Sequence, residues 1–106
     1  GVARIHGATV MVFLGFVVGL LVVLMRTRAS AALYRRVSVL LGLLVLQAGV
    51  GYLQYFNDVP PALVAIHVAG ATAVFAQSVL VLLGCREIAA TAGSQISNRR
   101  PVHAQS

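Results

Sequence analysis

The sequence predicts an all-α membrane protein with three transmembrane helices. Of its 106 residues, 59% are hydrophobic and 9% are charged, whereas about a quarter of the residues in a soluble domain are charged. Three uncharged apolar runs cover residues 5–25, 37–55 and 61–84, each close to the ~20 residues that cross a bilayer as a helix. Three strands cannot close a barrel, and an open sheet edge cannot face lipid, so helices are the expected structure.

The first run, residues 5–25, is expected to be a membrane span and not a cleaved signal peptide. It is longer than the apolar region of a signal peptide, arginines follow it, and no small-residue cleavage site is evident. Because the chain begins at Gly1 and not at Met, we expect further residues upstream in the encoded polypeptide. The single Cys85 excludes an intrachain disulfide and a cysteine metal cluster.

The arginines predict how the three runs are oriented. They lie mainly in the loop between the first two runs (Arg26, Arg28, Arg35, Arg36) and after the third run (Arg86, Arg99, Arg100). The loop between the second and third runs contains Asp58 and no basic residue. Arginine-rich short loops stay on the cytoplasmic side, so the net charge of +6 indicates sidedness in the cell membrane and not nucleic-acid binding.

The C-terminal segment, residues 87–106, is polar and shows no apolar periodicity. Such a composition is typical of a disordered end. We therefore expect a membrane-embedded part, residues 1–86, followed by a disordered cytoplasmic tail, residues 87–106.

Two histidines lie inside the apolar runs at matching depth. His6 precedes Met25 by 19 residues and His67 precedes Gly84 by 17, so at about 1.5 Å per residue both lie roughly 25–28 Å from the inner boundary. The first and third runs also point in the same direction. The two imidazoles are therefore expected at one level near the outer face, although they are 61 residues apart.

Ionisable side chains within spans usually face a bundle interior and indicate function. A pair of imidazoles can bind a metal ion, relay protons, hydrogen-bond within the bundle, or ligate a haem iron from both faces. Zinc normally takes three or four ligands, and proton relays use acidic groups; neither a carboxylate nor a thiol occurs at this depth. Haem needs only two axial nitrogens and an apolar slot, so haem ligation and a hydrogen-bonded pair remain the main alternatives.

Four residues expected near the two histidines are relevant to the hypothesis of a haem site. Gly70 and Ala71 follow His67 on the same helical face, and their small size predicts space for a flat macrocycle; simple close packing of helices is the alternative. Gln54 is level with the histidines and is expected to be a partner of the haem edge or an interhelical contact, whereas Gln47 and Gln77 lie deeper and are expected to be structural. Arg4 is a candidate partner of a haem propionate or an ordinary solvated flank, and His103 is expected to be solvated in the tail.

These residues resemble a known family. His6 at the start of one span, the stretch "LQAGVGYLQYFNDVPPALVAIHVAGA" across the next two, and the interval between the histidines are similar to the C-terminal half of haem A synthase. That family has eight membrane helices in two four-helix bundles, and its C-terminal bundle holds a b-type haem between two histidines. The resemblance implies that His6 and His67 are the axial ligands of haem b.

The resemblance also implies partners and marks departures. The complete enzyme would oxidise a methyl group of haem O to the formyl group of haem A, with haem O synthase or a terminal oxidase as possible partners. Only three of eight helices are present, so the remaining helices of the same polypeptide would supply the substrate site. The outer-loop cysteine pair of many members has no counterpart, because Cys85 lies on the inner side.

Two other functions fit the same sequence. A cytochrome b-like electron-transfer subunit would use the same histidines without substrate chemistry, and the upstream sequence would distinguish it from a synthase. A structural membrane subunit would use its histidines only for hydrogen bonds, and an optical spectrum would distinguish it from both haem proteins.

Overall fold

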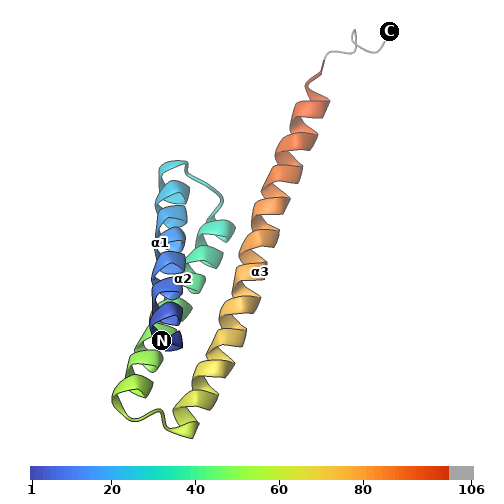
Figure 1. Ribbon diagram of the computed structural model, residues 1–106. Helices are drawn as coiled ribbons and strands as arrows, with labels where there is room; N and C mark the ends of the chain where they lie inside the picture. The colour runs from blue at the N-terminus through green and yellow to red at the C-terminus, as the bar shows by residue number, and fades with distance from the viewer. Residues whose placement is uncertain (101–106) are drawn as a thin grey trace.

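The computed structural model describes residues 1–100 and consists of three helices. They are α1 (Val2–Arg26), α2 (Ala31–Phe56) and α3 (Pro61–Asn98). Helices α1 and α3 run in the same direction and α2 returns between them, so the N-terminus lies at the same end as the α2–α3 connection (Figure 1). Each helix is long and apolar enough to cross a membrane. The chain is thus an all-α protein of the multi-pass membrane class, as the sequence predicts.

Both connecting turns follow the same hydrogen-bonding pattern. After α1, the N–H of Ala29 donates to the carbonyl of Leu24 at 3.1 Å, with Arg28 at φ 51°. After α2, the N–H of Val59 donates to the carbonyl of Gln54 at 2.9 Å, with Asp58 at φ 56°. This is the Schellman motif, in which a left-handed residue, usually glycine, ends the helix. Here arginine and aspartate take the left-handed position.

Local signals mark the starts of α2 and α3. The Ser30 hydroxyl accepts a hydrogen bond from the N–H of Leu33 at 3.3 Å and caps α2. As a result α2 begins at Ala31, six residues before the apolar run, and includes Arg35 and Arg36. Pro61 is the first residue of α3, where its missing N–H costs nothing.

The C-terminal half of α3 differs from the sequence-based expectation of a disordered tail after residue 86. The helix continues without interruption through Asn98. Residues 87–98 contain mainly good or neutral helix formers, and extending an existing helix avoids the cost of nucleation. The expected tail is therefore helical over most of its length, and residues 101–106 lie outside the described part of the chain.

The packed core occupies only one half of the bundle. All fully buried hydrophobic side chains belong to one cluster: Val17, Leu24, Leu33, Val37, Leu40, Leu44 and Val81. These residues lie in the half that contains the α1–α2 turn, opposite the end that carries the histidines. Elsewhere large apolar side chains such as Phe16 and Phe75 are more than 70% exposed, as expected for a surface that faces lipid.

Helix α2 holds the bundle together. It packs against both neighbours, whereas no Cα atom of α1 comes within 8 Å of one in α3 across the described residues. Three side chains donate hydrogen bonds of 2.8 Å to backbone carbonyls across the α2–α3 interface: Arg36 to Leu80, Gln77 to Arg36, and Gln47 to His67. Such bonds between membrane helices typically contribute about 0.6 kcal/mol each. The structural roles expected for Gln47 and Gln77 are therefore consistent with their contacts.

Candidate functional site

The fold brings the two intramembrane histidines together. His6 lies in the second turn of α1 and His67 in the second turn of α3, and their ring centroids are 6.2 Å apart with an angle of 78° between the ring planes. His6 is exposed and His67 is half-buried. The sequence thus places the two histidines at one level, and the structure brings their rings close together. The two rings meet across the only pair of helices that do not pack directly on each other.

The separation of the rings distinguishes between two kinds of histidine pair. A direct N–H···N hydrogen bond of about 2.9 Å would place the ring centres only about 5 Å apart. Two imidazoles on opposite sides of one metal ion, with metal–nitrogen bonds of about 2 Å, would have centres about 6 Å apart. The observed 6.2 Å is too long for the first arrangement and suits the second, as it also suits an ordinary edge-to-face contact of two rings. No hydrogen bond joins the rings within residues 1–100.

One nitrogen of the pair has no partner. The Nδ1 atom of His67 is buried and makes no hydrogen bond among the described residues. A buried polar atom without a partner is unusual, because it loses its bond to water and gains none in return. It is the kind of atom that a metal or a hydrogen-bonding ligand satisfies. The residues present therefore fit a metal-centred group that takes two nitrogen ligands.

Two residues of α2 pack around His67. A Cβ atom built at Gly51 would lie 3.4 Å from Cε1 of His67, so this edge of the imidazole lies against the glycine. One turn earlier on α2, the Gln47 amide donates from Nε2 to the carbonyl of His67 at 2.8 Å. Sequence reasoning assigned Gln47 only a structural role and did not single out Gly51. The sequence did contain one signal for Gly51: it lies one helical turn from Gln47, a polar residue suited to an interhelical contact.

The surroundings of Gly70 differ from the sequence-based expectation. The sequence predicts open space beside this glycine for a macrocycle, and the structure places the Gln47 amide there instead. A Cβ atom at Gly70 would meet Oε1 of Gln47 and lie 2.6 Å from its Cδ. The reason is the register between α2 and α3, which puts Gln47 opposite Gly70. The glycine accommodates a protein side chain, one turn from His67.

The other candidate residues make fewer contacts. Gln54 is half-buried, and its side chain forms no hydrogen bond within residues 1–100, although its backbone carbonyl accepts those of the following turn. Arg4 is exposed in the first turn of α1. The contacts of Gln54 and Arg4 assign no role to either residue, so their roles toward haem stay predictions. His103 lies outside the described residues.

A metal site built from protein ligands alone is not formed in the described part of the chain. No group of three or more His, Cys, Asp or Glu side chains lies close enough to hold an ion among residues 1–100. Cys85 is half-buried and packs near the core, far along α3 from His67.

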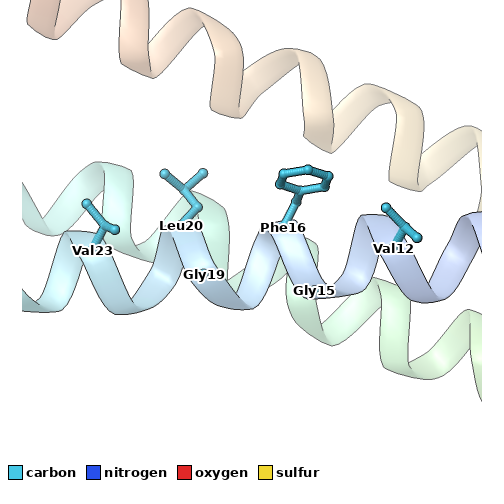
Figure 2. A pocket seen from close by; sticks show the side chains of 6 residues that line it. All are labelled: Val12, Gly15, Phe16, Gly19, Leu20 and Val23. Carbon is cyan, nitrogen blue, oxygen red and sulfur yellow. The ribbon is translucent and has the colours of Figure 1, made fainter.

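A groove of about 570 Å³ runs along α1, away from the histidines. Figure 2 shows Val12, Phe16, Leu20 and Val23 in a row along it, with Gly15 and Gly19 beside them. Cβ atoms built at both glycines would meet nothing within 4 Å, so no helix of the described chain packs closely on this face. The groove contains no polar side chain and provides no chemistry of its own.

Comparison of the chain with protein families, with curated proteins and with solved structures finds no match.

Proposed function

We propose that this chain is the C-terminal, b-type-haem-binding part of haem A synthase, with His6 and His67 as the two axial ligands of the iron. The observation that supports this most directly is the 6.2 Å separation of the two ring centroids. This separation suits one metal ion between two imidazoles and is too long for a direct hydrogen bond. The resemblance of the histidine-bearing segments selects haem and the particular enzyme.

Each residue of the proposed site has a separate task. His6 and His67 supply neutral imidazole nitrogens, which are good ligands for iron, and ligation would offset the cost of burying an unpaired Nδ1. Helix α2 keeps α1 and α3 apart beyond direct packing distance, which leaves them free to hold a flat group between them. A bound haem would supply one-electron redox chemistry at this level.

Further parts of the proposal rest on sequence. The α1–α2 turn and the end of α3 are cytoplasmic and the histidine end faces outward, because the arginines are distributed that way in the cell membrane. Arg4 and Gln54, near that outer end, are assigned to a propionate and to the haem edge. The exposed face of α1 around Gly15 and Gly19 is available to further helices of the same polypeptide.

The substrate chemistry belongs to the complete enzyme. Haem O would bind in the other part of the polypeptide and be oxidised there to haem A, with haem O synthase or a terminal oxidase as neighbours in the pathway. Residues 1–100 contain no buried acidic side chain that would serve as a catalytic acid or base. This part of the chain would therefore carry the cofactor and not the catalytic group.

A cytochrome b-like electron-transfer subunit is the second candidate. The same histidine geometry supports it, and it requires no substrate site. Sequencing upstream of Gly1 separates the two candidates, because a second four-helix bundle is required only for the synthase.

The test is a reduced-minus-oxidised optical spectrum of the full-length protein and of three variants. His6→Ala and His67→Ala should each lose the six-coordinate, low-spin b-type signal or retain much less haem, because half of the iron coordination is removed. His103→Ala is the matched control and should leave the spectrum unchanged. A low-spin signal from this part of the protein that survives both alanine substitutions would refute the assignment.

A further inference from the structure

We infer that Gln47 and Gly51 of α2 are positioning residues that fix the orientation of the His67 imidazole. Both lie on one face of α2, one turn apart, and both lie against His67: Gln47 at its backbone carbonyl and Gly51 at Cε1 of its ring. The inference concerns the orientation of the ring itself. Its consequence for ligation rests on the proposed haem site, and the experiment below separates the two.

The Gln47 amide packs directly on Gly70. Any side chain at Gly70 would collide with the Gln47 amide, since a Cβ atom there would lie 2.6 Å from Cδ and 3.1 Å from Nε2. The glycine therefore allows the amide to lie flat on α3, where Nε2 reaches the carbonyl of His67 at 2.8 Å. This contact sets both the rotation and the height of α3 relative to α2 at the residue that carries the imidazole.

The His67 imidazole lies against Gly51 in the same way. The Cβ position of Gly51 lies 3.4 Å from Cε1 of His67, at the near limit of ordinary van der Waals contact. An alanine methyl group would fit there in ordinary contact, and a bulky side chain such as leucine would crowd the ring. The two fits are reciprocal: a large side chain of α2 meets a glycine of α3, and a large side chain of α3 meets a glycine of α2.

No hydrogen bond of the ring fixes the orientation of the His67 imidazole. Histidines that bind metals usually donate their second nitrogen to a carboxylate or carbonyl, which fixes the ring. Neither ring nitrogen of His67 makes a hydrogen bond among the described residues, so whichever nitrogen is the ligand, the other lacks such a partner. The packed core lies in the opposite half of the bundle, so it does not clamp this end. The direction of the imidazole therefore depends on the contacts of Gln47 and Gly51.

Gln77 provides a matched control. Like Gln47, it donates from Nε2 to a backbone carbonyl across the α2–α3 interface at 2.8 Å, in its case to Arg36. Gln47→Met and Gln77→Met each keep the length of the side chain and remove the donor. Both variants should lose similar stability, and only Gln47→Met should disturb His67. Gly51→Leu, with Gly49→Leu as its control on an open face, tests the second contact in the same way.

The experiment uses the full-length protein in lipid nanodiscs with ¹³C,¹⁵N-labelled histidine. Without haem, we expect one set of His67 ring signals in the wild type and in Gln77→Met and Gly49→Leu. We expect shifted or multiple ring signals in Gln47→Met and Gly51→Leu. With haem added, the last two variants should bind it about tenfold more weakly, the scale typical of lost contacts that orient a ligand, and their low-spin spectra should change.

The outcomes separate the two proposals. Unchanged ring signals in both Gln47→Met and Gly51→Leu, or equal changes in the two controls, would overturn the positioning role. If the ring signals change as expected and the wild type binds no haem, the positioning role holds and the haem assignment fails. If a variant does not fold, the other member of the pair still tests its own contact with His67.

Discussion

A double-mutant cycle between Gln47 and Gly70 tests the α2–α3 register. Gly70→Ala places a methyl group where the Gln47 amide lies, 2.6 Å from Cδ, so the amide must move and its hydrogen bond to His67 breaks. Because the Gln47 amide is the far end of a flexible side chain, overpacking should cost about 1 kcal/mol, the low end of its range, and the lost membrane hydrogen bond about 0.6 kcal/mol. The helix-forming tendency of alanine returns up to about 1 kcal/mol. We expect a net loss of about 0.6–1.6 kcal/mol, summed from these terms.

The second substitution should reverse the sign of this effect. In a Gln47→Ala background the obstructing amide is gone, so Gly70→Ala should be neutral or stabilise by up to about 1 kcal/mol. The coupling between the two sites should then reach at least about 1.5 kcal/mol, within the range for residues in contact. Reversible unfolding of the full-length protein in mixed micelles, followed by far-UV circular dichroism, measures all four corners of the cycle.

The control is Gly49→Ala, at a position where a Cβ atom would meet nothing within 4 Å. It should not destabilise the protein. If the two single substitutions add within about 0.5 kcal/mol, as distant sites do, then Gln47 does not lie on Gly70 and the reasoning about the register is wrong.

Three further predictions concern other parts of the bundle. Gly84→Ala should be up to about 1 kcal/mol less favourable than Gly42→Ala, because a Cβ atom at Gly84 would lie 3.1 Å from Leu33 and one at Gly42 would meet nothing within 4 Å; the same unfolding assay compares them. Asp58→Gly should stabilise by up to about 1 kcal/mol, because glycine adopts the left-handed conformation of this turn without steric cost; an equal effect of Asp58→Ala would contradict this cause. In a cysteine-free background, a cysteine at Asn57 should react with membrane-impermeant reagents in intact cells and one at Ser30 should not; the reverse pattern would invert the proposed orientation.

The number of helices and the meeting of the histidines could both be predicted from the sequence. Lipid requires a continuous apolar run for each crossing, so three runs predict three helices. The level of His6 and of His67 follows from counting residues along rigid helices, without any knowledge of packing. The shared level of two residues 61 positions apart was therefore predictable, and the structure shows that their rings also lie close together.

The ends of the helices and the neighbours of His67 could not be predicted in the same way. Apolar runs indicate where lipid lies and not where the backbone hydrogen bonds stop, so the first turn of α2 and residues 87–98 of α3 were missed. The sequence also leaves open how α2 and α3 are rotated against each other. That rotation decides whether Gly70 faces a free space or Gln47, and the structure shows Gln47.

The length of α3 determines how far its last charges lie from the lipid. The helix continues 14 residues beyond Gly84 to Asn98, about 21 Å at 1.5 Å per residue if it stands upright. The Debye length at physiological ionic strength is only about 8 Å. Salt would then screen Arg99 and Arg100 from anionic headgroups. The arginines of the α1–α2 turn and Arg86 would supply the electrostatic attraction to the membrane surface. The tip of α3 instead presents its two charges to the aqueous phase.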